Sequence, residues 1–320
     1  MCPRFCEVDR TSGETGFCGQ GTEMQIAFAG IHRGEEPPVS TAVDSYTGSG
    51  TVFFTGCTLR CSYCQNRQIS QNNIGTAVSI HEFSKICMAL ERQGAANINL
   101  VSGTQFIPSI RAGIEAARSV GLTVPVVWNT SSYESDEGLQ VLLPIADIFL
   151  ADIKTLSSAH SRRFCASGTY PDEAVKALLI MAEKTDLTFG ASNNIVSGTI
   201  IRHLVIPGEM ESTERVIRWL SSGDFQLKRV LISILVQFVD ADDTDRLMRI
   251  TESEYTDLVS MLNKYGIEDG YIQELDDTDY TDWVPDFTKP NPFPASFSDP
   301  VWHYLTGFNS KPGALKAPDL

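Results

Sequence analysis

The chain has 320 residues, of which 42% are hydrophobic and 20% are charged, so composition predicts a large folded core and excludes a disordered or fibrous protein. It carries 25 Lys and Arg against 40 Asp and Glu, a net charge of −15 that opposes general binding to nucleic acid or anionic lipid. The sequence shows neither an apolar run of the roughly 18 residues that span a membrane nor a signal-peptide pattern. We therefore expect a cytoplasmic protein without a membrane partner.

The N-terminal stretch is rich in glycine, proline and polar residues and has no sustained hydrophobic period, which predicts an irregular cap over residues 1–45. Three of the eight cysteines, Cys2, Cys6 and Cys18, lie in this cap. In a cytoplasmic protein such cysteines are more typical of metal ligands or reduced thiols than of disulfides. We leave three readings open: zinc or a second metal site with a further ligand such as His32, free thiols, or a disulfide.

Short apolar segments alternate with helical periods over residues 46–270, which predicts repeated β-α units and a parallel sheet covered by helices. The period alone does not decide between an open sheet and a barrel. The predicted strands are Thr51–Thr55, Asn97–Val101, Val124–Trp128, Ile145–Asp152, Thr199–Val205 and Arg229–Val236. The helical periods begin near Ile80, Ile107, Val175, Thr213 and Tyr255.

The last part of the chain, residues 271–320, is predicted to be an extended C-terminal tail. Between Asp276 and Pro300 it combines five prolines with aromatic residues, a composition too aromatic for a disordered linker. We expect this segment to cover the domain.

The most informative motif is Cys57-x3-Cys61-x2-Cys64, on a loop that leaves the first predicted strand. Three thiolates from one loop can hold three corners of a [4Fe-4S] cubane and leave one iron open, whereas electron-transfer clusters ordinarily take four cysteines. The amino and carboxylate groups of S-adenosylmethionine (SAM) suit that iron, and one electron then cleaves the sulfonium to methionine and a 5′-deoxyadenosyl radical. The alternatives are a tetrahedral zinc site with a distant fourth ligand, or unrelated thiols.

The segment Thr51–Asn66 resembles the cluster loop of radical SAM proteins, in particular those similar to the pyruvate formate-lyase activating enzyme. The resemblance extends to about Asp240 and implies an α/β fold with a partial (β/α)6 barrel of the radical SAM type, with SAM across the strand ends. It implies that Tyr63 packs near adenine. It also implies that the segment Ser102, Gly103, Thr104 contacts the SAM amino group, although Ser and Thr replace the usual glycine and acidic residue. Asn129 stands where relatives have an acidic SAM contact.

Four further residues at predicted strand ends follow from the same resemblance. Asp152 would accept from the SAM ammonium, Lys154 would pair with the SAM carboxylate, and Arg202 would point toward that carboxylate. Gln237 stands where a relative has a ribose contact. The residues alone leave alternatives open, because Asp152 and Lys154 could form an ordinary surface pair and Arg202 could neutralise a buried carboxylate.

The sequence therefore predicts a radical SAM enzyme that abstracts hydrogen from an unidentified substrate. The resemblance implies a protein substrate, in the manner of a glycyl-radical-enzyme activase; the alternative is an iron-sulfur binding or redox protein without SAM turnover. The cluster needs a low-potential electron donor such as flavodoxin or ferredoxin. Since donor and chain are both acidic, we expect docking at a local basic patch that includes Arg60 and Arg67.

Overall fold

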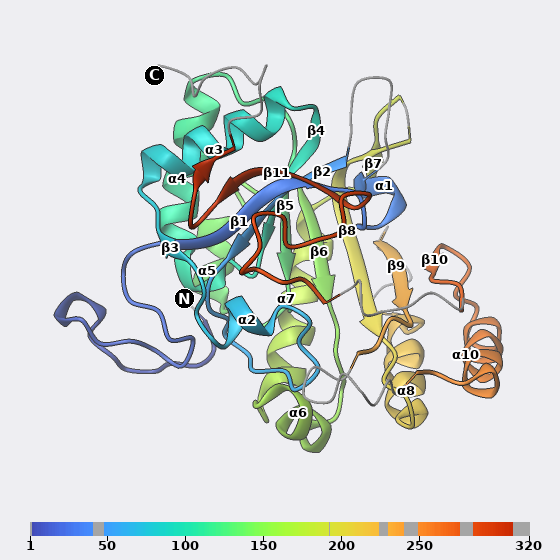
Figure 1. Ribbon diagram of the computed structural model, residues 1–320. Helices are drawn as coiled ribbons and strands as arrows, with labels where there is room; N and C mark the ends of the chain where they lie inside the picture. Colours follow the sequence, from blue (N-terminus) through green and yellow to red (C-terminus); the bar gives the residue numbers. More distant parts are fainter. Residues whose placement is uncertain are drawn as a thin grey trace.

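The computed structural model describes residues 2–40, 48–191, 193–223, 230–239, 249–275 and 284–309 (Figure 1). In these residues the strands form one sheet in the order β10-β9-β8-β6-β5-β4-β2-β1-β11-β12, with β3 paired to β1 and β7 to β8. Every neighbouring pair from β2 through β9 to β10 is parallel, whereas β1 and β11 add antiparallel strands beside β2. This confirms an α/β fold with a mostly parallel, open sheet that matches a partial barrel. The expected boundary at residues 45 and 46 lies outside the described residues.

The strands alternate with helices along most of the chain. The strands are β1 Gln25–His32, β2 Gly48–Phe54, β3 Thr76–Ala77, β4 Ala95–Val101, β5 Val126–Thr130, β6 Ile148–Asp152, β7 Thr188–Phe189, β8 Ile195–Leu204, β9 Val230–Leu235, β10 Gly270–Ile272, β11 Ser298–His303 and β12 Gly307–Phe308. The helices are α1 Pro37–Ser40, α2 Arg67–Ser70, α3 Ile80–Arg92, α4 Ile107–Ser119, α5 Asp136–Leu142, α6 Ser158–Cys165, α7 Tyr170–Lys184, α8 Met210–Leu220 and α10 Glu252–Lys264, with 3-10 turns at Arg10–Ser12 and Thr104–Phe106.

The six predicted strands correspond to β2, β4, β5, β6, β8 and β9. The expectation that residues 1–45 are irregular was wrong in one respect, because they contain strand β1. Its six central residues are all buried, so both faces of the strand are covered. Apolar and polar residues therefore do not alternate along its sequence, and the period of two that marks a half-exposed strand is absent. The strand joins the N-terminal segment to the sheet rather than leaving it as a separate cap.

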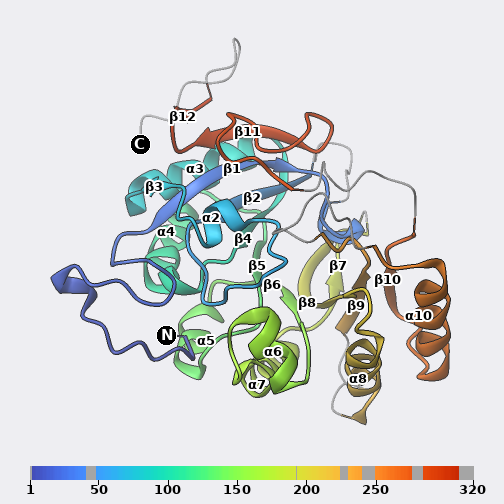
Figure 2. The ribbon, with the colours of Figure 1, turned by 60° about the horizontal axis from the view of Figure 1, so that its bottom comes forward.

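The helices cover the outer face of the sheet, as the view toward the carboxyl ends of the parallel strands shows (Figure 2). Helix α3 is typical: the Ser79 side chain accepts from the backbone N–H of Glu82 at its start, and Phe83, Ile86 and Leu90 form its buried stripe. Cys87 lies on the same stripe and is fully buried, as a small core residue. None of the described helices is long and apolar enough to cross a bilayer.

Residues 284–309 lie along the edge of the sheet, where β11 pairs with β1 (Figure 2). Phe287 is fully buried, and the Phe293 ring lies 5.4 Å from that of Phe53. This part of the predicted tail therefore packs against the sheet, while residues 276–283 and 310–320 lie outside the described residues.

The inner face of the curved sheet is unusually polar. Asp152 pairs with Arg202, and Arg202 pairs with Ser233. Because side chains alternate along a strand, the register places Asn99 and Asn129 on the same face as these three residues. Closer to the amino ends of the strands the inner face is mostly apolar, although Asn97 lies there and donates to the Val39 carbonyl at 2.7 Å.

Helix α1 fills that apolar part of the inner face. Its Val39 packs in one cluster with Val127, Ile148 and Leu150. The chain reaches this position because β1 is antiparallel to β2, so that His32, at the end of β1, pairs with Ser49 at the start of β2. The residues just before α1 consequently form the floor of a pocket that opens at the carboxyl ends of the parallel strands.

Candidate active site

A pocket of about 490 Å³ lies at the carboxyl ends of the parallel strands, within the usual size range of small-molecule sites. Carboxyl ends of parallel strands are where functional residues gather in such folds. The cysteine loop after β2 forms one wall, and the ends of β5, β6, β8 and β9 form others. The predicted residues that line it are Cys57, Cys61, Tyr63, Cys64, Ser102, Asn129, Asp152, Lys154, Arg202 and Gln237.

The cysteine loop starts from a tight turn at Gly56. This residue has a φ of +79°, and an added Cβ would lie 2.6 Å from the Cys18 carbonyl oxygen. Only glycine adopts this backbone without strain and tolerates so close an approach. The Gly56 N–H donates to the Ile69 carbonyl at 2.9 Å, which ties the start of the loop to α2.

Side chains from distant parts of the chain hold the rest of the loop. The buried Gln105 amide nitrogen lies 2.9 Å from the Thr55 carbonyl oxygen and 3.0 Å from that of Gly56. The Gln71 side chain donates to the Cys61 carbonyl at 2.9 Å. These bonds hold the backbone of the loop at its start and at Cys61.

The three loop cysteines are thiols in a buried setting. Burial raises the pKa of Cys57 to about 12, and burial likewise raises the pKa of Cys64. A metal centre needs thiolates, so cofactor binding must displace these protons. Cys165, at the end of α6, is also buried here, and its sulfur lies 3.8 Å from the Tyr63 hydroxyl.

The sequence left two metal centres open for this loop, an iron-sulfur cluster and a single zinc ion. Among the described residues, no group of three or more His, Cys, Asp or Glu side chains could hold one metal ion. A tetrahedral zinc ion gathers its ligands at about 2.0–2.3 Å, whereas the corners of a cubane hold three thiolates farther apart. The three thiols of this loop line one pocket, and the [4Fe-4S] cluster that they would hold stays a prediction.

Beside the cysteines, Lys154 and Asp152 form a buried ion pair with a separation of 3.0 Å. Their side chains are only 16% and 22% exposed, which excludes the ordinary surface pair. Burial opposes both charges, but the cations Arg202 and Lys154 hold the pKa of Asp152 below its usual value. Tyr170 fixes this strand end, since its hydroxyl donates to the Asp152 carbonyl and accepts from the Lys154 N–H.

Arg202 is enclosed by acids of the protein itself. Its Nε donates to Asp152 at 2.8 Å, and its Nη1 lies 3.5 Å from Glu35 and 3.7 Å from Glu36. Its Nη2 donates to Oδ1 of the Asn129 side chain at 2.7 Å. The neutralisation of buried carboxylates, which the sequence left open for Arg202, is therefore present in the structure. Its contact with SAM stays a prediction.

The segment after β4 has one residue, Ser102, in the pocket lining, whereas Gly103 and Thr104 lie outside it. Ser102 lines the pocket and has a φ of +58°, a strained value for a residue other than glycine that is common at functional sites. Gly103 and Thr104 do not line it: the Thr104 hydroxyl, 4% exposed, donates to the buried Glu134 at 2.8 Å. A SAM contact by the Thr104 side chain is not supported by this geometry, since its hydroxyl is already bonded away from the pocket.

The remaining predicted residues are placed clearly. Tyr63 is 6% exposed beside the loop, and the Gln237 side chain accepts from Gln273 at 3.2 Å. His203 faces away from the pocket and makes two buried contacts, with the Ile153 carbonyl and the Thr213 hydroxyl, as a structural histidine would. The lack of a three-ligand group extends to Cys2, Cys6 and Cys18, so the structure gives no support to a second metal site.

Sequence reasoning missed Glu35 and Glu36, which line the floor of the pocket with His32. Two adjacent glutamates before Pro37 look like a surface loop, and no spacing marks them as pocket residues. The available signal was the run of polar residues in otherwise apolar strands, such as Asn97 and Asn99, which indicates a polar interior.

A cysteine loop at the carboxyl edge of a partial barrel, facing buried charges, defines a class of iron-sulfur enzyme that binds a small polar cofactor. The family model of the Radical SAM superfamily matches residues 51–220, more than half of the chain. The chain belongs to the radical SAM superfamily. Membership implies a [4Fe-4S] cluster, SAM and a reductant.

Individual relatives add little about the substrate. The uncharacterized protein MJ0674 of Methanocaldococcus jannaschii is 26% identical over 277 residues, 84% of this chain and 75% of that protein. A structure of SuiB from Streptococcus suis, bound to its precursor peptide SuiA, has 10% identity and a TM-score of 0.47 over 69% of this chain and 47% of SuiB. This chain thus spans about half the length of SuiB. A domain of a pyruvate-formate lyase-activating enzyme from Bacteroides vulgatus has 15% identity and a TM-score of 0.39 over 53% of this chain and 93% of the domain.

Proposed function

We propose that this protein reductively cleaves SAM and uses the resulting radical to abstract hydrogen from a substrate. The observation that carries the proposal is the placement of all three loop cysteines in one pocket that also contains the Asp152–Lys154 pair. When bound, the cluster and SAM would supply the chemistry, namely electron transfer and generation of a 5′-deoxyadenosyl radical. The protein would supply thiolates, charge and shielding from water.

The residues divide these tasks. Cys57, Cys61 and Cys64 would hold the cluster and leave its fourth corner toward the pocket. In the proposed complex, Lys154 would pair with the SAM carboxylate and Asp152 would accept from the SAM ammonium, since both groups adjoin the cysteines. Asn129, Ser102 and Gln237 line the remaining path along the strand ends, where the adenosyl group would lie.

The direct test is to incubate anaerobically reconstituted protein with SAM and dithionite and to quantify 5′-deoxyadenosine and methionine. We expect both products, in equal amounts, and none when S-adenosylhomocysteine replaces SAM. An intact cluster that yields no deoxyadenosine would instead support the second class of function, an iron-sulfur protein without SAM turnover.

We expect Lys154→Ala to raise the apparent dissociation constant for SAM by about tenfold, or about 1.4 kcal/mol, because it removes a partly buried charge partner of the SAM carboxylate. The measurement is SAM titration of the reconstituted protein. Lys176→Ala is the matched control, since Lys176 is 63% exposed on α7 and, among the described residues, forms an ion pair with Glu173 alone. Equal SAM affinity in Lys154→Ala and Lys176→Ala would remove Lys154 from the proposed site.

An electron donor could dock on the face of the cysteine loop that carries Arg60. This side chain is exposed, donates to the Phe17 carbonyl at 3.1 Å and has its guanidinium carbon 4.8 Å from the Phe17 ring centre. The N-terminal segment thereby holds a cation beside the loop. A flavodoxin or ferredoxin, both acidic, would approach this cation against the general charge of −15.

A further inference from the structure

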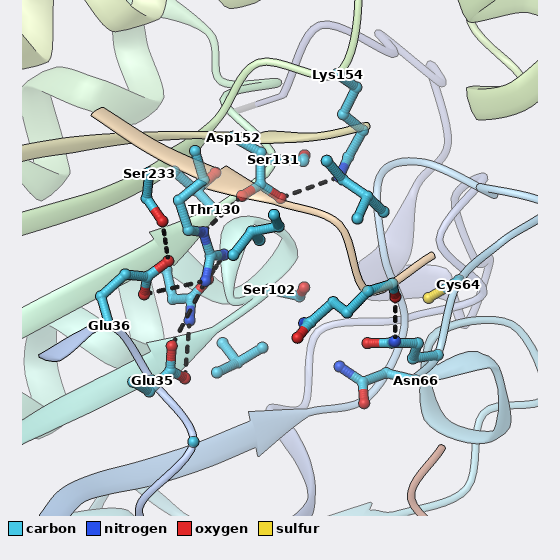
Figure 3. Close-up of a pocket in the computed structure, with 18 of the residues that line it drawn as sticks. Glu35, Glu36, Cys64, Asn66, Ser102, Thr130, Ser131, Asp152, Lys154 and Ser233 are labelled. Carbon is cyan, nitrogen blue, oxygen red and sulfur yellow. Dashed lines mark hydrogen bonds and ion pairs between the residues drawn. The ribbon is translucent and has the colours of Figure 1, made fainter. Parts of the chain in front are cut away.

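The floor of the pocket carries acidic groups that the proposed cleavage of SAM does not use. In the close-up view, Glu35 and Glu36 lie on the opposite side of the pocket from Cys64, and Ser102 lies between (Figure 3). Both glutamates reach the pocket from the segment between β1 and α1, and their side chains are 10% and 5% exposed. They are therefore buried in the wall, far from the loop that would hold the cluster.

The charges in the pocket do not balance. Among its described lining residues, Glu35, Glu36 and Asp152 supply three carboxyl groups, whereas Lys154 and Arg202 supply two cations. Lys154 pairs with Asp152, and Arg202 is shared among all three acids. Burial raises the pKa of Glu35 and that of Glu36, because the single arginine offsets only part of the cost of two buried negative charges.

Three buried polar atoms at or beside this floor have no hydrogen bond within the described residues, namely His32 Nδ1, Asn99 Oδ1 and Glu36 Oε2. Glu36 Oε1 accepts from the Ser233 hydroxyl at 3.2 Å, but the buried Oε2 accepts from no group. Its cationic partner, Arg202 Nη1, lies 3.7 Å away, beyond hydrogen-bond distance. A buried carboxylate oxygen without a donor is costly, and a donor that carries a positive charge would satisfy it best.

The wall beside the acids is aromatic. The His32 ring, which lines the pocket three positions before Glu35, lies 4.8 Å from the Phe293 ring. Burial and the neighbouring Arg33 lower the pKa of His32 to about 4, so this ring is neutral at physiological pH and does not repel a cation. Aromatic faces next to carboxylates are the surroundings that organic cations prefer.

We propose that Glu35 and Glu36 form a subsite for a positively charged nitrogen group, an ammonium or guanidinium, of the substrate. This proposal rests on the proposed function for the identity of the ligand as substrate. In the proposed complex the ammonium of SAM would not fill this role, because it would lie at the cluster beside the cysteines, with Asp152 as its acceptor. The substrate class is therefore an organic cation whose charged end enters the pocket first and whose reacting carbon lies toward the cysteine loop.

The test measures binding of n-butylguanidinium and n-butylammonium to the reconstituted protein, with neutral n-butylurea as the isosteric comparison, by ligand-observed NMR in 150 mM salt. At least one cation should bind at least tenfold more tightly than butylurea. The Glu35→Gln/Glu36→Gln double variant should lose that tenfold preference. The matched control is Glu134→Gln, which removes a buried carboxyl group outside the pocket and should keep the preference.

A second arm decides which ligand the acids serve. The cation and SAM should bind to the wild-type protein together, whereas displacement of the cation by SAM would assign the glutamates to SAM and overturn the proposal. Equal binding of butylurea and both cations to the wild-type protein would also overturn it. Both of these outcomes are measured on the wild-type protein, so the proposal can be overturned even if the double variant does not fold. Neither arm requires deoxyadenosine formation, so cation binding by a protein that does not cleave SAM would contradict the proposed function alone.

Discussion

Cys61→Ala should reduce deoxyadenosine formation to the level seen without protein and should remove most of the iron. The reason is that three thiolates of one loop would hold three corners of the proposed cluster, and loss of one would leave two irons without a cysteine. Cys57→Ala and Cys64→Ala should behave alike, since all three sulfurs face the same pocket. The measurements are iron per chain after anaerobic reconstitution and deoxyadenosine after addition of SAM and dithionite.

Cys87→Ala is the control for loss of a buried cysteine. Cys87 is fully buried on α3 and does not line the pocket, so this variant should keep its iron and its activity even if it unfolds more readily. Full iron content and activity in Cys61→Ala would refute the assignment of the cluster to this loop.

Arg202→Met should lower the free energy of unfolding at pH 8 by about 3–5 kcal/mol, because it leaves carboxylates buried without their shared cation. The arginine side chain is 15% exposed and forms ion pairs with Asp152, Glu35 and Glu36, so solvent cannot replace it. Anaerobic urea unfolding of the wild type and the variant measures the difference. Arg215→Met, which removes an exposed partner of Glu211, should change stability by less than about 0.5 kcal/mol.

The pH dependence separates lost charge from lost packing. Arg202 lowers the pKa values of the three neighbouring acids, so in the variant these values are higher in the folded state. A group with a raised folded pKa gains stability relative to the unfolded chain as pH falls. The deficit of Arg202→Met should consequently shrink between pH 8 and pH 5. A deficit that is constant over this range would mean that the variant is less stable because of lost packing contacts and not because of the lost charge.

The sequence by itself determined those features of the protein whose residues lie close together along the chain. The cluster loop is readable because its cysteines lie within eight positions, and the parallel strands are readable because each is a short apolar run between helical periods. Asp152 and Lys154 were also predictable, since they sit side by side at one strand end. The local pattern therefore predicted the class of fold, and it predicted three cysteines and an ion pair that the structure places in one pocket.

Only the tertiary structure decided what surrounds Arg202. Its contact with Glu35 joins residues 167 positions apart. The contact exists because β1 runs antiparallel to β2, so that the chain after β1 places Glu35 and α1 against the inner face of the sheet. No local pattern encodes that path, since β1 is buried on both faces and the glutamates resemble a surface loop. Likewise, the Thr104 hydroxyl looked available in the sequence, but a buried Glu134 thirty positions later accepts its hydrogen bond. Long-range pairing sets which polar side chains face the pocket, and a linear pattern does not contain that information.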